Sequence, residues 1–220
     1  MHPVACALLR LERSERLAGD VVGTIKVALP QAAIANGGRC LSRKTQEVDF
    51  RSAEPGDEVA IAEVHVLTWQ VAYRGMIPDA FLDGLSVSQR TDNWRRIINE
   101  LDPPATGALV ALIGPEVVGF VHFCPSRDGD ADPNVGEVTA IYVQPAHWSK
   151  GIGRGLLQRA VVSLEEAGYS SATLWVIDGN ARACRFYDDG GWKTDGVTKK
   201  DERAGFTLHE VRYATALRAK

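Results

Sequence analysis

The chain has 220 residues, 45% of them hydrophobic and 24% charged, and a formal net charge of -3 at pH 7. This charge gives no electrostatic basis for binding nucleic acid, no apolar run approaches the roughly 18–20 residues that cross a bilayer, and the four cysteines lack metal-ligand spacing. We therefore expect a cytoplasmic protein with reduced thiols and a sizeable core, without a metal, a nucleic-acid partner or a membrane partner.

Residues 1–44 stand apart from the rest of the chain. They carry only weak periodicity, with a short predicted helix over 5–17, and they end near the turn-forming run Asn36-Gly37-Gly38-Arg39. A mobile extension and a segment translated from an early start codon both explain this pattern. We therefore divide the chain into an N-terminal extension over 1–44 and one domain over 45–220.

The first half of this domain begins with a strand and two amphipathic helices. Residues 48–52 alternate as a strand, and a helix is predicted over 55–71, whose first residue is a proline suited to a first helical turn. A second helix begins at a cap, Ser86 or Ser88, and runs through Leu101. The buried face of the first helix is predicted to hold Val59, Ala62, Val66 and Trp69.

Strands dominate the second half of the domain. The runs 106–113 and 117–124 flank Gly114-Pro115 and predict a hairpin. Strands in meander order, followed by strands mixed with helices, indicate an α/β or α+β fold with a mostly antiparallel sheet. The later elements are predicted as strands over 136–143, 173–177, 192–197 and 206–217 and helices over 151–167 and 180–189.

The run 139–157 is the most informative part of the sequence. It reads as a β-branched strand, a seven-residue loop, a glycine cluster and an amphipathic helix. Glycines at a helix start let backbone come close to a ligand, and the N–H groups of the first turn have no partner inside the helix. Together with the helix dipole, these donors predict a site for a phosphorylated ligand.

A dinucleotide site is one alternative for this run. Its pattern, G-x-G-x-x-G, expects an acid about 20 residues further on, and Asp178 matches that position. However, Leu156 stands where the third glycine belongs, and the residues 144–150 make the turn too long. A glycine-rich connection that binds nothing is the other alternative.

The run resembles the coenzyme A pyrophosphate loop of the GNAT superfamily of N-acetyltransferases. That loop has the pattern Gln/Arg-x-x-Gly-x-Gly/Ala and follows a strand that ends like Leu-Tyr-Val-x-Pro; here it maps onto residues 148–153. Trp148 stands where Gln or Arg is usual. The run 174–192 resembles the family's next strand and helix, and 69–78 resembles an acceptor-side helix and turn of a bacterial subgroup. Together the matches extend over about 48–217.

The resemblance implies acetyl transfer from acetyl-CoA to a primary amine of a small molecule or a peptide, by direct attack in a ternary complex. It also implies a GNAT-like sheet, with a V-shaped splay between the strands at 136–143 and 172–177 where the coenzyme enters. The residues that it assigns to coenzyme binding are Ile141, Tyr142, Val143, Trp148, Ser149, Lys150, Gly151, Ile152, Gly153, Arg154, Gly155, Asn180 and Tyr187.

Two residues carry the expected chemistry. The resemblance places Tyr187 near the thioester sulfur, where it would protonate the leaving thiolate, although a core tyrosine would have the same sequence. An amine must be neutral to attack, and Glu137 is our candidate base. Its alternation with Thr139 and Ile141 places these three on one face of the strand. A strand-edge carboxylate that faces water is the alternative.

The sequence gives less information about the residues that bind the acceptor and about the oligomeric state. Trp69, Tyr73 and Arg74 are predicted to bind the acceptor, and Arg74 would suit a carboxylate on it. Core packing explains the spacing of the two aromatic residues equally well. A homodimer stays open, and so does a non-catalytic acyl-CoA-binding module on the same fold.

Overall fold

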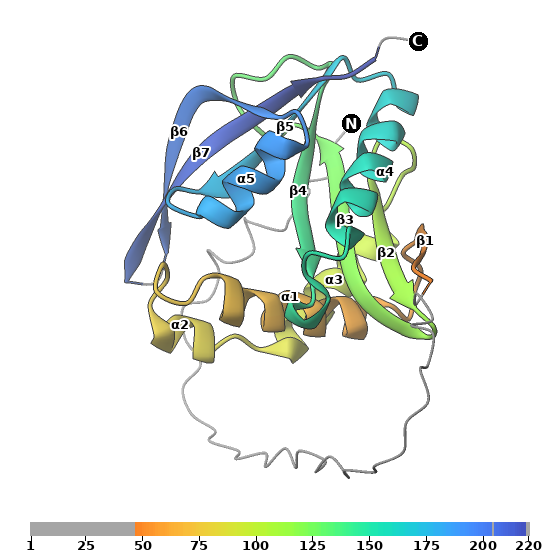
Figure 1. The fold of residues 1–220 in the computed structure, drawn as a ribbon. Helices are drawn as coiled ribbons and strands as arrows, with labels where there is room; N and C mark the ends of the chain where they lie inside the picture. The colour runs from red at the N-terminus through yellow and green to blue at the C-terminus, as the bar shows by residue number, and fades with distance from the viewer. Residues whose placement is uncertain (1–46, 204, 219–220) are drawn as a thin grey trace, which may run out of the picture.

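The structure is a computed structural model that describes residues 47–203 and 205–218. The prediction of an extension over 1–44, including its short helix, lies outside these residues. The described chain forms a mixed sheet of seven strands in the order β1-β2-β3-β4-β5-β7-β6 (Figure 1). The strands are β1 Asp49–Ser52, β2 Gly107–Ile113, β3 Glu116–Pro125, β4 Val135–Val143, β5 Ser171–Ile177, β6 Lys193–Arg203 and β7 Phe206–Ala216.

All neighbouring strands pair antiparallel except β4 and β5, which are parallel. The predicted α/β fold with a mostly antiparallel sheet flanked by helices is therefore confirmed. The helices are α1 Glu58–Ala72, α2 Asp79–Asp83, α3 Val87–Asn99, α4 Ile152–Glu166 and α5 Ala181–Asp189, with a 3₁₀ turn at Pro145–His147. In the described part of the chain, none of them has the length and apolar character needed to cross a membrane.

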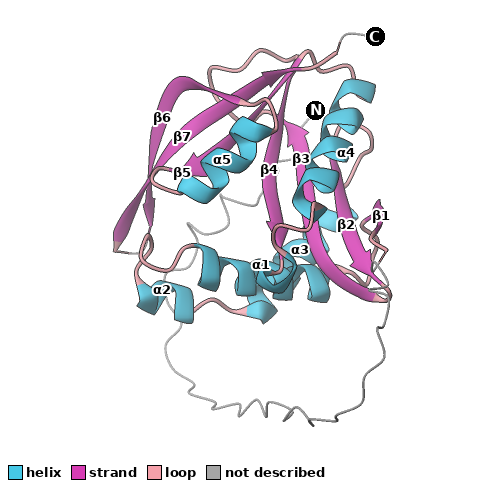
Figure 2. Ribbon diagram, in the orientation of Figure 1, coloured by secondary structure: helices cyan, strands magenta, loops and turns pink. Residues whose placement is uncertain are grey.

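The helices cover the two faces of the sheet separately (Figure 2). Helices α1 and α3 pack through Ile61 and Trp94 onto one face, in a cluster with Phe120 of β3. On the opposite face, α4 packs through Leu156 and Leu164, in a cluster that also includes Tyr187 of α5. Both clusters are apolar and deeply buried, which is the main stabilisation expected for such a layered fold.

The beginning of α1 differs from its prediction. The helix starts at Glu58, not at residue 55, because the Asp57 carboxylate accepts the Glu54 N–H at 2.9 Å and pairs with Arg51, which fixes a turn before the helix. Val59 was predicted to be buried but is 47% exposed. Apolar residues occupy most of the surface of α1, so spacing alone did not determine which side faces the core.

Helix α3 agrees more closely with its prediction. Ser86 is the cap, because its hydroxyl accepts the Gln89 N–H at 3.2 Å, and Ser88 lies inside the helix. The helix ends at Asn99, slightly before the predicted Leu101. The short α2, at Asp79–Asp83, was not predicted.

Candidate active site

The centre of the sheet opens between β4 and β5. These parallel strands pair only at their beginnings, where residues 135–137 lie opposite residues 171–173. Beyond those positions β4 stays paired with β3, and β5 with β7, so β4 and β5 diverge (Figure 2). This divergence is the splay that the resemblance implied.

The unpaired edge of β4 presents backbone groups to the gap. The Gln144 N–H donates to the Val118 carbonyl at 2.8 Å, which makes these two residues a hydrogen-bonded pair of the β3–β4 ladder. Hydrogen-bonded and non-hydrogen-bonded pairs alternate along an antiparallel ladder. Ile141 and Val143 therefore direct their N–H and C=O groups away from β3 and toward the gap.

The N-terminus of α4 also carries backbone donors. The first bond within this helix runs from the Gly155 N–H to the Gly151 carbonyl at 3.0 Å, and in the described chain the N–H groups of 152–154 donate to no backbone acceptor. Ser149 and Gly151 have φ angles of 61° and 83°, so the chain turns sharply just before the helix. Free donors at a helix N-terminus form an anion site.

Two glycines bring α4 close to its neighbours. A Cβ on Gly153 would lie 3.4 Å from the Phe186 ring of α5, and a Cβ on Gly155 would lie 2.6 Å from the Phe50 ring of β1. Packing against Phe50 therefore explains Gly155 without a ligand. A contact between Gly155 and a coenzyme stays a prediction.

Trp148 joins three segments around the mouth of the gap. Its indole N–H donates to the Val143 carbonyl at 2.6 Å, and the Arg182 guanidinium of α5 lies 3.9 Å from the centre of its ring. A cation over an indole ring is attracted to it, so this contact connects α5 with the loop before α4. The predicted Lys150 and Arg154 are exposed beside this loop.

Helix α5 positions Asn180 and Tyr187. The Asn180 side chain accepts the Ala183 N–H at 3.1 Å, which caps the helix. Tyr187 is 8% exposed, and its ring packs 5.9 Å from that of Tyr213. Burial raises the pKa of Tyr187, and the neighbouring Tyr142 raises it further, so the hydroxyl keeps its proton at neutral pH.

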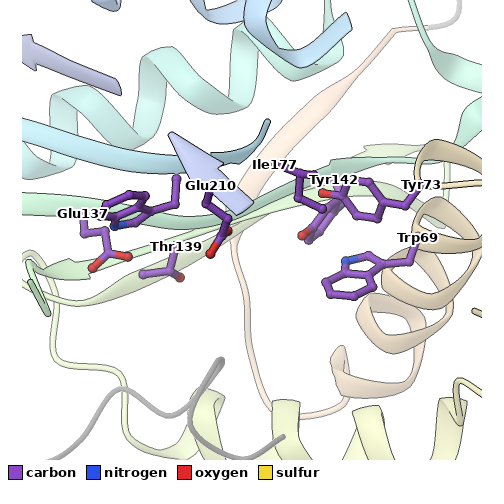
Figure 3. A pocket seen from close by; sticks show the side chains of 8 residues that line it. Trp69, Tyr73, Glu137, Thr139, Tyr142, Ile177 and Glu210 are labelled. Atoms are coloured by element: carbon purple, nitrogen blue, oxygen red, sulfur yellow. The ribbon is translucent and has the colours of Figure 1, made fainter. Parts of the chain in front are cut away.

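A small cavity of about 50 Å³ lies where the gap meets α1 (Figure 3). Its residues come from α1, β4, β5 and β7, so both edges of the gap contribute to its walls. They are Trp69, Tyr73, Glu137, Thr139, Tyr142, Trp175, Ile177 and Glu210. Hereafter these eight residues are the acceptor cavity. The structure thus brings together Trp69, Tyr73 and Glu137, which the sequence analysis had singled out separately.

Arg74 does not line this cavity. Its guanidinium pairs with Asp79 at 3.2 Å and Asp83 at 2.8 Å, both in α2. The side chain is also 44% exposed. A contact between Arg74 and an acceptor carboxylate stays a prediction.

Glu137 is buried and paired. It is 1% exposed, and the Arg127 guanidinium donates to both of its carboxylate oxygens, while the Arg127 N–H donates to Oε2 at 3.1 Å. Glu137 is therefore not a carboxylate that faces water.

The alternation predicted for β4 is wrong in one respect. A shift in the β3–β4 register beside Thr139 inserts an extra residue in β4, so Tyr142 lines the cavity with Glu137 and Thr139. Ile141 instead packs into the cluster beneath α4.

Glu210 is the ionisable residue among the three cavity residues, with Trp175 and Ile177, that were not predicted from the sequence. It is 8% exposed, and the Lys199 ammonium lies 3.4 Å from its Oε2 without forming a hydrogen bond. Burial raises the pKa of Glu210, and Lys199 acts in the opposite direction. The only sequence signal is its place in the alternating strand between Leu208 and Arg212, which also fits an ordinary sheet residue.

Comparisons with known proteins agree with this geometry. The model of the acetyltransferase (GNAT) family matches residues 69–192. YuaI of Bacillus subtilis, an uncharacterized N-acetyltransferase, is 33% identical over 166 residues, which cover 74% of this chain and 90% of YuaI.

Two solved structures share the fold. PaiA N-acetyltransferase from Thermoplasma acidophilum, in complex with coenzyme A, superposes with a TM-score of 0.61 at 19% identity, covering 77% of this chain and 99% of its own. The structure of yncA from Salmonella typhimurium, with its cofactor acetyl-CoA, gives a TM-score of 0.60 at 21% identity and covers 79% of this chain and 96% of its own.

Proposed function

The chain belongs to the acetyltransferase (GNAT) family, and we propose that it moves an acetyl group from acetyl-CoA to a primary amine of a small molecule or a protein. The observation that carries this proposal is the gap between β4 and β5, which runs from the free N–H groups of α4 to the acceptor cavity. The acceptor's identity, a homodimer and a cytoplasmic location stay predictions.

The residues around the gap suit a coenzyme with a pyrophosphate and an amide-containing arm. The N–H groups of 152–154 would bind the pyrophosphate, with Lys150 and Arg154 adding positive charge. The backbone groups of Ile141 and the Val143 N–H would form hydrogen bonds with the arm, while the Val143 carbonyl already accepts the Trp148 and Thr68 side chains. Acetyl-CoA supplies the activated acyl group.

We assign the chemical steps to direct attack in a ternary complex. The Val143 N–H is directed to the gap, so it would polarise the thioester carbonyl. Tyr187 stays protonated because its pKa is raised, and it would give its proton to the leaving thiolate while the attacking nitrogen gives a proton back to the phenolate. Holding both reactants in place removes the need for a covalent enzyme intermediate.

Glu137 remains in the proposal as a carboxylate of the acceptor cavity. As a base it would take a proton from the acceptor amine. Its two oxygens are already engaged by Arg127, so this role requires that contact to loosen.

Ligand-dependent stability is the first test. Melting the protein with acetyl-CoA, with CoA and with NADH should give a shift for both CoA species and none for NADH. At ten times Kd the expected stabilisation is about 1.4 kcal/mol. A shift with NADH alone would overturn the proposal.

Turnover then separates an enzyme from a regulatory module. Release of CoA in the presence of an amine supports the proposed transfer. Binding of acetyl-CoA without any release of CoA would instead favour a non-catalytic acyl-CoA-binding module.

A further inference from the structure

The acceptor cavity contains two buried polar atoms without hydrogen-bond partners. Within the described residues, neither Glu210 Oε2 nor the Trp69 indole N–H has one, and these residues are 8% and 6% exposed. The Lys199 ammonium lies 3.4 Å from Glu210 Oε2, and a buried carboxylate oxygen that accepts no hydrogen bond is costly and uncommon in native proteins. Their presence in one cavity indicates that a ligand with a strong donor completes it.

The walls of the cavity indicate the charge of that ligand. Four of the eight lining residues are aromatic, namely Trp69, Tyr73, Tyr142 and Trp175. Of the described residues, those that line the cavity include two carboxylates but no lysine or arginine; Arg127 and Lys199 pair with these carboxylates from outside the lining. Aromatic faces and a carboxylate together favour an alkylammonium group, and they disfavour a carboxylate.

We propose that Glu210 binds the ammonium group of the acceptor and removes its proton, and that the acceptor is a primary alkylamine without a carboxylate on the carbon next to the nitrogen. This inference rests on the proposed function and specifies its substrate class. Figure 3 shows Glu210 between Thr139 on one side and Ile177 and Tyr142 on the other. A nitrogen held there lies at the junction of β4 and β5, where the gap meets the cavity.

Glu210 is better suited to this step than Glu137. Arg127 donates to both oxygens of Glu137, so that carboxylate is already neutralised by a fixed partner. Lys199, by contrast, lies 3.4 Å from Glu210 and only 4.0 Å from the centre of the Trp175 ring. The Trp175 ring can hold the Lys199 ammonium when the substrate's ammonium approaches Glu210.

The protons balance across the reaction. The ammonium nitrogen gives one proton to Glu210 and becomes a neutral amine, which forms the N–C bond as the C–S bond breaks. Its second proton replaces the one that Tyr187 gives to the thiolate, and its third stays on the product amide. Glu210 releases its proton to solvent, so the net products are an amide, CoA and one proton.

The surroundings of Glu210 also determine how the step responds to pH. Lys199, Asp201 and Arg203 of β6 face it, as do Tyr73 of α1 and Tyr142 of β4. Burial is the largest influence and raises the pKa of Glu210, which brings a carboxylate closer to the pH range of a working base. Activity should therefore fall on the acid side as Glu210 becomes protonated.

Matched amines test the substrate class. We would compare pentylamine with norleucine, and tyramine with tyrosine, because each compound has a single amine and the members of each pair differ by the carboxylate on the carbon next to it. The expected kcat/KM for the amine without the carboxylate is at least about tenfold higher in each pair, which corresponds to about 1.4 kcal/mol. Equal or better use of the amino acids would overturn the inference.

Substitutions at Glu210 test its proposed role in binding and deprotonating the amine. In Glu210→Gln we expect an increase of at least about tenfold in KM for the amine, an unchanged KM for acetyl-CoA, and loss of the acid limb of the kcat/KM profile. Glu210→Asp should restore part of that limb. The matched control is Glu202→Gln, an exposed carboxylate of β6 outside the cavity, which should behave as the wild type. If Glu137→Gln loses the acid limb while Glu210→Gln keeps it, Glu137 is the base and the inference fails.

A binding measurement tests the inference even if none of the amines is acetylated. With CoA present, 1,5-diaminopentane should change the tryptophan fluorescence saturably, since Trp69 and Trp175 line the cavity. The change should require a higher concentration in Glu210→Gln. The same titration curve for wild type and Glu210→Gln, or no change in fluorescence at all, overturns the inference. Failure of acetyl-CoA to stabilise the protein would instead overturn the proposed function.

Discussion

The two sides of the β4–β5 gap differ in the chemical groups that form them, backbone groups on one side and side chains on the other. The coenzyme side, which consists of the edge of β4 at 138–143 and the loop and helix start at 148–155, presents backbone N–H and C=O groups. The acceptor cavity consists of side chains from four elements far apart in the sequence. Backbone donors do not depend on side-chain identity, so we expect the first side to tolerate Trp148 at an unusual position. We expect substitutions on the second side to change which acceptor fits.

The largest expected effect is at Tyr187 of α5, the proposed proton donor, which belongs to neither of these two sets of residues. Tyr187→Phe should lower kcat by about 10²-fold or more and leave acetyl-CoA affinity near that of the wild type, because it removes only the proton donor. Steady-state kinetics and calorimetric titration measure the two quantities. The control is Tyr213→Phe, since that ring packs against Tyr187 but does not line the cavity. Unchanged turnover in Tyr187→Phe would remove this residue from the mechanism.

Two glycines at opposite ends of α4 test whether the coenzyme side depends on backbone geometry. Gly151 and Gly168 have φ angles of 83° and 89°, with open space where a Cβ would be. Gly151→Ala and Gly168→Ala should therefore each cost about 1–2 kcal/mol of folding free energy. Only Gly151→Ala should also weaken acetyl-CoA binding, by about tenfold. Equal acetyl-CoA affinities for the two variants, measured by calorimetry, would contradict the proposed phosphate site.

A third change asks how much the coenzyme side depends on the Trp148 side chain. Trp148→Phe keeps a ring beneath Arg182 and removes the indole N–H, while the Val143 carbonyl still accepts the Thr68 hydroxyl. We expect a loss of about 0.5–1.5 kcal/mol in folding free energy. Acetyl-CoA affinity should change by less than about threefold, since the backbone donors remain. A collapse of affinity in calorimetric titrations would show that the side chain is essential there.

The smallest effect concerns the stability of the acceptor side. Burial raises the pKa of Glu210, so in the folded protein its carboxyl holds its proton to a higher pH than in the unfolded chain. Below the unfolded pKa of about 4.3 the carboxyl is protonated in both states. As pH rises through that value and then through the folded pKa, the wild type should lose stability relative to Glu210→Gln. Melts of both proteins across this range check the trend, and a constant difference would contradict it.

The contrast between a side formed by consecutive residues and a cavity formed by distant side chains also explains which features the sequence predicted. The helices that follow the glycine loop and Asn180 were predicted because each depends on residues that are neighbours in the chain. The hairpin at Gly114-Pro115 was confirmed for the same reason. The seven-strand sheet followed from local alternation together with the resemblance.

Features that depend on tertiary contacts were missed. Glu210 becomes distinctive only when β7 pairs with β5 and aligns it with Ile177. The bulge beside Thr139 is invisible to strict alternation, which is why Ile141 was assigned to the wrong face. Val59 was misplaced because α1 carries apolar residues on its exposed side as well as its buried one.

The short pairing of β4 and β5 also bears on aggregation. Strands with unpaired backbone normally occur at the outside of a sheet, where they can recruit strands from other molecules. Here the unpaired edges of β4 and β5 face each other within one sheet, and the side chains beside the β4 edge pack on its two faces, Tyr142 against the cluster of α1 and Val143 into the cluster of α4. The protein can therefore keep strand edges available for a small ligand without presenting them to another chain.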